Sequence, residues 1–156
     1  MKIYLASDHA GYELKEALAP FLVERGYTVE DVGPVELNPE DDYPDHMLPL
    51  ALKVADDKGS AGIVMGGSGQ GEAMVANRVK GVRAAVYYGP PSHKASDGQA
   101  AADILTLSRE HNDANVLSIG ARFISIEDAT QAIIKWLQTP FSGEERHARR
   151  IKKIDG

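Results

Sequence analysis

The sequence contains no cysteine among its 156 residues. A disulfide framework, a thiolate metal site and a cysteine nucleophile are therefore excluded. The absence is compatible with a reducing compartment, and we expect a cytoplasmic protein. A chain of this length has the usual size of one domain and buries a hydrophobic core without covalent cross-links. We therefore expect residues 1–156 to form one domain.

Long hydrophobic runs are also missing. A transmembrane helix needs about 20 mostly apolar residues in succession, and no segment approaches this length. A signal peptide needs an apolar stretch of about 7–15 residues after its basic start. Asp8 and His9 interrupt the first apolar stretch too early for that. We therefore expect neither a signal peptide nor a membrane partner.

The chain has no excess of positive charge, since its net charge is −6. A protein that binds nucleic acid normally presents a basic face, so nucleic acid is disfavoured as a partner. Basic side chains nevertheless gather near the C-terminal end, at Arg146, His147, Arg149, Arg150, Lys152 and Lys153. Such a cluster is either a solvated helix face or a group that holds an anion.

Hydrophobic spacing predicts strands that alternate with helices. The predicted strands are 2–6, 27–32, 62–65, 82–88 and 116–119, and the predicted helices are 14–22, 48–55, 73–79, 100–109, 126–137 and 143–154. Residues 33–44 and 89–98 have the composition of loops. This alternation predicts a three-layer α/β/α, Rossmann-like domain with a mostly parallel, five-stranded sheet.

Polar clusters follow three of the predicted strands, at Ser7–His9, Gly66–Glu72 and Gly120–Arg122. In open parallel sheets, ligands bind at the carboxyl ends of the strands. A fourth cluster, Arg109–Asn112, precedes a strand instead. We therefore expect the first three clusters to meet in one site.

The middle cluster is a glycine loop, GGSGQGE, between a strand and a helix. Glycines allow a tight turn and bring backbone N–H groups close to a ligand. The start of the helix adds free N–H donors and the positive end of the helix dipole. The loop is therefore a candidate anion site.

Three familiar motifs do not fit this loop. A P-loop needs Lys and Ser or Thr after its last glycine, where Glu72 and Ala73 stand. A dinucleotide fingerprint fails because its last glycine would be Glu72 or Met74. A serine-hydrolase elbow around Ser68 fails because Gln70 replaces its last glycine.

An oxyanion cradle with a carboxylate beside it remains, which suits proton abstraction next to a carbonyl. From the local spacing alone, Glu72 is equally well an ordinary residue of the first helical turn.

Six segments occur in an order that resembles a known family: SDHAG (7–11), DDYPD (41–45), the glycine loop (66–72), REHND (109–113), IGAR (119–122) and the RHxxR pattern (146–150). Together they resemble the type B ribose-5-phosphate isomerases, in the superfamily that includes galactose-6-phosphate isomerase, over nearly the whole chain. One branch of that family has a cysteine at the first loop position, where this chain has Gly66. This chain is similar to the branch whose base is a glutamate closing the loop, Glu72.

The resemblance implies roles for residues throughout the chain. It implies that Glu72 is the proton-transferring base, with an anion hole formed by Ser68 and the amides of Gly67, Gly69 and Gly71. Ring opening is assigned to Asp8 and His111, and contact with the sugar to Tyr43. Phosphate binding is assigned to His9, Arg122, Arg146 and Arg150. Family members are homodimers in which His111 and Asn112 reach the partner's site, and the sequence leaves a tetramer open.

Local patterns alone support these roles only in part. Arg146 and Arg150 are four residues apart, so they share a helix face, but this spacing by itself favours a solvated pair. Asp8 is also a plausible helix cap, and Tyr43 is also plausible as plain packing. His9 and His111 are each compatible with an ordinary hydrogen-bonded histidine.

The resemblance implies an intramolecular oxidoreductase that interconverts ribose 5-phosphate and ribulose 5-phosphate through an enediolate. One alternative is the same chemistry on a four- or six-carbon sugar phosphate such as galactose 6-phosphate. It is motivated by the segment between Tyr88 and Arg109, which is longer than the family pattern. Another alternative is a non-catalytic phosphate-binding module. The five histidines show no metal-ligand spacing, so we expect neither a metal nor another cofactor.

Glu72 faces opposing influences on its pKa. The helix start lowers the pKa of a carboxyl group, whereas a general base needs a pKa nearer the working pH. We expect an apolar wall of Val64, Met65, Met74 and Val75 to desolvate the group. Glu72 is therefore predicted to be at least partly buried, with a pKa that rises further when a phosphorylated substrate binds.

Overall fold

The computed structural model of the chain describes residues 1–90 and 103–156. Most of the long segment after Tyr88, and the start of the helix predicted over 100–109, lie outside the described residues. The described elements, in chain order, are β1 (Lys2–Ser7), α1 (Tyr12–Glu24), β2 (Thr28–Gly33), α2 (Pro44–Asp56), β3 (Ala61–Gly66), α3 (Gln70–Ala76), β4 (Ala84–Tyr87), α4 (Ile104–Glu110), β5 (Val116–Gly120), α5 (Ile126–Gln138) and α6 (Glu145–Asp155).

All strand pairs in the described sheet are parallel, and the strand order is β2-β1-β3-β5-β4. The predicted five-stranded parallel sheet is therefore confirmed. From β1 the chain passes to β2 at one edge, and it then crosses to β3 on the other side of β1, so β1 and β3 flank the switch point, where open α/β sheets bind ligands. Strand β4 forms the other edge, and β5 lies between β3 and β4. The pairing of Ser7 with Met65 and of Gly66 with Gly120 aligns the carboxyl ends of β1, β3 and β5.

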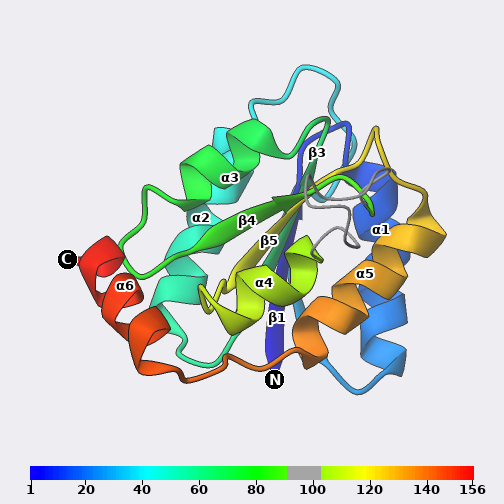
Figure 1. Cartoon of the computed structure of the whole chain (residues 1–156). Helices are drawn as coiled ribbons and strands as arrows, with labels where there is room; N and C mark the ends of the chain where they lie inside the picture. Colours follow the sequence, from blue (N-terminus) through cyan, green and yellow to red (C-terminus); the bar gives the residue numbers. More distant parts are fainter. Residues whose placement is uncertain (91–102) are drawn as a thin grey trace.

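The two faces of the sheet are covered by different helices, as Figure 1 shows. Ile3, Leu5 and Ile63 lie in a core cluster with buried residues of α1, α4 and α5. The alternate residues Tyr4 and Val64 lie in a second cluster with residues of α2 and α3. Successive strand residues point to opposite faces, so two apolar faces require helices on both sides. The three-layer prediction is confirmed.

Within the described residues, the side chain of Asp103 accepts hydrogen bonds from the N–H groups of Leu105 and Thr106 and so caps the start of α4. Helices α2 and α3 begin earlier than predicted, and α2 begins at Pro44 rather than at residue 48. Helix α3 begins at Gln70 rather than at residue 73, because Gly69 adopts a left-handed conformation (φ 74°) that ends the loop there. Glu72 therefore lies in the first turn of α3.

Candidate active site

The predicted meeting of three polar clusters is confirmed at the carboxyl edge of the sheet. A pocket of about 360 Å³ is lined by Asp8, His9, Ala10, Gly67, Ser68, Glu72, Arg122 and Phe123. These residues follow β1, β3 and β5, whose carboxyl ends lie side by side. The pocket combines two carboxyl groups with an arginine and a histidine.

The glycine loop is held against β5 by backbone and side-chain hydrogen bonds. The Ser118 hydroxyl donates to the Gly69 carbonyl at 2.6 Å, and the Ala121 N–H donates to the Gly66 carbonyl at 2.8 Å. A Cβ atom at Gly69 would lie 3.1 Å from the Gly120 nitrogen, so there is little room for a side chain. The loop therefore has a fixed path, as a preorganised anion site requires.

Glu72 is buried, as predicted, with 4% of its surface exposed. Its carboxyl group packs directly on Gly66, where a Cβ atom would lie 1.8 Å from Oε1. Its Oε2 is buried and has no hydrogen-bond partner among the described residues. A buried carboxyl oxygen without a partner is rare in folded proteins, which marks Glu72 as a candidate proton acceptor.

Burial raises the pKa of Glu72 above its ordinary value, and the nearby Asp8 carboxyl group raises this pKa further. The backbone N–H of Glu72 itself acts in the opposite direction. The predicted apolar wall is only partly right, because Val64 and Met65 are buried whereas Met74 is 66% exposed. Met74 occupies an outward position of α3 and does not contribute to this desolvation.

The side chain of Asp8 is held in place by the turn that follows β1. Its Oδ1 accepts hydrogen bonds from the N–H groups of Ala10, at 2.8 Å, and of Gly11, at 3.0 Å. The turn brings Gly11 so close to β3 that a Cβ atom there would lie 2.3 Å from the Met65 carbonyl oxygen. The side chain of Asp8 thus stabilises the turn and also forms part of the pocket lining beside Glu72.

Arg122 supplies positive charge directly above the glycine loop. Its guanidinium carbon would lie 3.3 Å from a Cβ atom at Gly67, and its backbone N–H donates to the Gly67 carbonyl at 3.3 Å. Tyr43 packs on the same loop from the start of α2, and a Cβ atom at Gly71 would lie 2.7 Å from its ring. Gly67 and Ser68 belong to the pocket lining, whereas Gly69 and Gly71 lie beside it and let neighbouring residues approach.

The remaining predicted site residues lie elsewhere. His111 follows α4, and its ring centroid is 4.1 Å from that of His147 on α6. His111 and Asn112 precede β5, whose five residues span about 16 Å, whereas the pocket lies beyond its carboxyl end. Helix α6, which carries Arg146 and Arg150, lies near the amino end of β5 in Figure 1.

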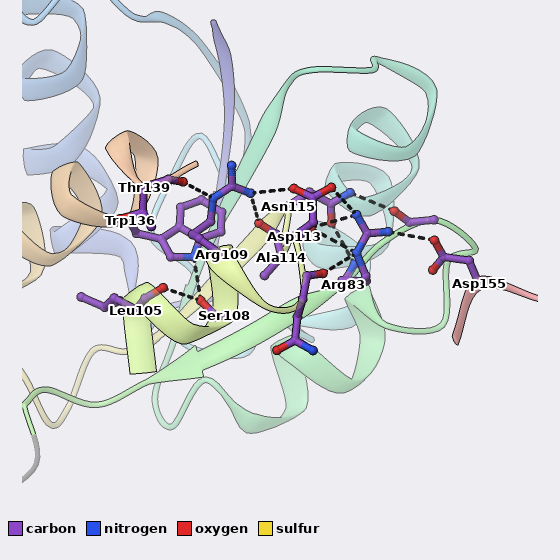
Figure 2. A network of polar contacts seen from close by, with 12 residues as sticks. Arg83, Leu105, Ser108, Arg109, Asp113, Ala114, Asn115, Trp136, Thr139 and Asp155 are labelled. Atoms are coloured by element: carbon purple, nitrogen blue, oxygen red, sulfur yellow. Dashed lines mark hydrogen bonds and ion pairs between the residues drawn. The ribbon is translucent and has the colours of Figure 1, made fainter. Parts of the chain in front are cut away.

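Two arginines hold the turn that follows α4, and Figure 2 shows Arg83 and Arg109 on either side of Asp113 and Ala114 in this turn. Arg83 donates to the carbonyl groups of Asn112 and Asp113, both at 2.8 Å, and to the Asp155 carboxylate on α6 at 2.9 Å. Arg109 donates to the Thr139 carbonyl at 3.0 Å, and burial lowers the pKa of its guanidinium group. These contacts support Asp113 in a left-handed conformation (φ 44°), so this turn has a defined shape.

Sequence reasoning missed some residues of the pocket and its surroundings. Ala10 and Phe123 line the pocket, and the Asp41 carboxylate contacts the rings of His9 and His46. Asp41 belongs to the DDYPD segment, which the resemblance had already singled out. The segment did not indicate that the Asp41 side chain contacts His9 and His46. In the described residues, no helix is long and apolar enough to cross a membrane.

The fold and the pocket together define an α/β protein with neighbouring carboxyl groups, a fixed glycine loop, an arginine and a histidine at its switch point. This arrangement suits proton transfer on a small anionic substrate.

The sequence model of the Ribose/Galactose Isomerase family matches residues 3–154, and the chain belongs to this family. Ribose-5-phosphate isomerase B of Mycobacterium tuberculosis is 40% identical over 151 residues, which cover 97% of this chain and 86% of that protein. The Escherichia coli protein of the same name is 36% identical over 153 residues, covering 98% and 93% of the two chains.

Solved structures show the same fold. The crystal structure of ribose-5-phosphate isomerase B from Mycoplasma genitalium with bound ribulose-5-phosphate has a TM-score of 0.86 at 35% identity, covering 99% of this chain and 93% of that one. The enzyme from Thermotoga maritima has a TM-score of 0.85 at 38% identity, covering 99% and 97%.

Proposed function

We propose that this protein interconverts ribose 5-phosphate and ribulose 5-phosphate, with Glu72 as the proton-transferring base. The observation that carries the proposal is the buried Glu72 carboxyl group, whose Oε2 has no hydrogen-bond partner among the described residues and whose pKa is raised. The name and bound sugar phosphate of the Mycoplasma genitalium structure support the choice of substrate.

In the proposed reaction, Glu72 removes the proton from C2 of the open-chain aldose. The electron pair forms the C1–C2 double bond of an enediolate, and negative charge develops on O1. Glu72 then returns the proton to C1 while the O2 proton passes to O1, which leaves the ketose. N–H groups of the glycine loop stabilise the enediolate oxygen, and among the predicted donors Gly67 lies in the pocket lining.

The packing of Glu72 on Gly66 supports assignment to the branch that uses a glutamate base. Any side chain at position 66 would collide with the Glu72 carboxyl group, since a Cβ atom there would lie 1.8 Å from Oε1. A cysteine at position 66 and this conformation of Glu72 are therefore mutually exclusive. Glycine at position 66 is the residue that leaves the carboxyl group room to face the pocket.

We further propose a homodimer in which each active site uses both chains. Glu72, Asp8, His9 and Arg122 meet at the carboxyl ends of the strands, while His111, Asn112, Arg146 and Arg150 lie near the amino end of β5. About 16 Å of strand separates the two groups in one chain. In the proposed dimer, a second copy of the chain supplies the predicted site residues that are missing from the pocket. These are the phosphate-binding arginines and His111, which is one of the two candidates for ring opening.

Isotope exchange tests the reaction. Wild-type protein is expected to incorporate solvent deuterium at C2 of the aldose phosphate, whereas a phosphate-binding module binds without exchange. The Glu72→Gln variant keeps the shape of the side chain but cannot accept a proton, so we expect normal binding and a loss of turnover of about 10²–10⁴-fold. Near-normal turnover in this variant would transfer the role of base to Asp8 or His111.

Complementation tests the shared site. Glu72→Gln and His111→Ala chains are each expected to be nearly inactive, but a mixed dimer has one site that carries both changes and one intact site. Random re-assembly of equal amounts should therefore restore about a quarter of the wild-type sites. Activity that stays at the level of the separate variants, despite mixed dimers detected by mass spectrometry, contradicts the shared site.

Turnover on a panel of aldose phosphates tests the substrate. We expect the five-carbon substrate to have the highest kcat/KM. A higher value for a four- or six-carbon aldose phosphate would favour the alternative suggested by the long segment after Tyr88.

A further inference from the structure

A carboxylate outside the pocket lining holds one of the histidines that form the lining. Asp41 lies in the loop between β2 and α2, and 5% of its side chain is exposed. Its Oδ1 is 2.7 Å from His9 Nδ1 and also accepts the backbone N–H of His9 at 3.2 Å. Its Oδ2 is 3.4 Å from His46 Nε2. Asp41 therefore lies between two imidazole rings and fixes both the backbone and the ring of His9.

The burial of Asp41 determines where the proton on the His9 ring lies. A buried carboxylate is costly unless donors surround it, so the ring nitrogen that faces it carries a proton. A proton on His9 Nδ1 directs this edge of the ring into the protein and leaves Nε2 for a ligand. In the described part of the chain, Nε2 has no hydrogen-bond partner, and the His9 side chain is 35% exposed beside the pocket.

His46 supports Asp41 from the other side. Its Nε2 faces Asp41 Oδ2, and its Nδ1 would lie 3.4 Å from a Cβ atom at Gly33, at the end of β2. The ring therefore fills the space between the carboxylate and the sheet. Oδ2 has no hydrogen-bond partner among the described residues, so the side-chain hydrogen bonds of Asp41 go to His9 alone. The backbone N–H of Asp41 donates to the Asn38 carbonyl at 3.2 Å, which fixes the loop that carries the carboxylate.

We propose that Asp41 is a positioning residue that orients His9 so that Nε2 donates a hydrogen bond to the phosphate group of the substrate. A second proton on the ring creates a cation whose charge the Asp41 carboxylate balances, as a buried carboxylate does for an imidazolium in other acid–base sites. The inference rests on the proposed function in one respect, namely that His9 contacts the substrate.

A double-mutant cycle tests the inference. Asp41→Asn removes the charge but keeps the shape, and we expect KM to rise about tenfold, because a misoriented His9 ring loses a hydrogen bond to a charged group of the substrate. His9→Ala should raise KM by at least as much. In the His9→Ala background, adding Asp41→Asn should change KM less than about twofold, since the ring that it orients is gone. Glu40→Gln, which removes one charge from the same loop at an exposed position, is the matched control and should leave KM unchanged.

The outcomes separate the inference from the proposed function. Equal effects of Asp41→Asn in both backgrounds would show a general structural role and overturn the inference. An unchanged KM in His9→Ala would also overturn it, while loss of turnover in Glu72→Gln would still support the isomerase.

A measurement on the wild-type protein tests the orientation of His9 even if the Asp41→Asn variant folds poorly. Nitrogen-15 NMR of the neutral His9 ring should show the proton on Nδ1, and a proton found on Nε2 instead would refute the positioning role.

Discussion

Replacement of Gly66 by alanine is the sharpest test of how the active site is packed. The added Cβ atom would lie 1.8 Å from Oε1, 2.3 Å from Cδ and 2.9 Å from Cγ of Glu72. Ordinary contacts begin near 3.4 Å, so the carboxyl oxygen must move by about 1.6 Å. The atoms that must move belong to the end of a flexible side chain, so the protein can fold around the change.

A displacement of this size should be seen mainly in kcat. A shift of about 1 Å in a reacting group can reduce the rate about 10²-fold, so we expect kcat to fall at least 100-fold, about 2.7 kcal/mol in activation free energy. KM should change little, because the side chains of His9 and Arg122 are not displaced. Steady-state kinetics and a thermal melt of the same preparation provide the measurement.

The double variant Gly66→Ala/Glu72→Gln is the control. Both changes act on one carboxyl group, so the double variant should be scarcely slower than Glu72→Gln alone. A folded Gly66→Ala protein with near-normal kcat would refute the argument, because it would show that catalysis does not depend on the observed position of Glu72. A full multiplication of the two losses would show that the alanine acts through something other than Glu72.

Other predictions concern charge, pH and metals. Arg146→Ala and Arg150→Ala should each weaken sugar-phosphate binding about tenfold or more, since a charge-assisted bond contributes roughly 1.5–3 kcal/mol; normal affinity in both variants, measured by calorimetry, would contradict the clamp. Because the base must be ionised and burial raises the pKa of Glu72, kcat/KM should fall with decreasing pH at values above the ordinary 4.5 of a glutamate, and a profile flat down to 4.5 would be inconsistent with this. The ionised form is the one that burial disfavours, so the contribution of Glu72 to folding stability increases as pH falls through its raised pKa, and Glu72→Gln should unfold at neutral pH at no lower a temperature than wild type. Arg83→Lys should lower the unfolding free energy by about 1–3 kcal/mol, because lysine cannot replace the bonds to Asn112, Asp113 and Asp155; an unchanged denaturant midpoint would argue against the importance of this network. Activity should survive a strong chelator, and a loss restored by a divalent ion would disprove the metal-free mechanism.

The sequence by itself determined the layers and the place of the pocket. Strands alternate with helices along the chain, which predicts a parallel sheet with helices on both faces. The successive residues Ile3 and Tyr4 of β1 are both buried and enter different cores, as that arrangement requires. Parallel strands place all their carboxyl ends at one edge, so polar clusters after three strands had to converge there. The glycine loop also excluded nucleotide and serine-hydrolase chemistry, because those chemistries need particular residues at fixed spacing.

Only the tertiary structure decided which side chains touch. Asp41 and His9 are 32 residues apart and meet because an irregular loop returns to the end of β1. The contact of Glu72 with Gly66 depends on the path of the loop and on a side-chain rotamer, neither of which hydrophobic spacing reports. The separation of His111 from Glu72 likewise follows from the direction of β5 in the sheet, since residues before a parallel strand lie at the end opposite to those that follow it. Arg146 lies near the same amino end because α5 leads the chain back from the carboxyl edge before α6 begins. Local patterns specify which residues are buried and where chains turn, whereas the pairing of charged groups across loops is a property of the assembled fold.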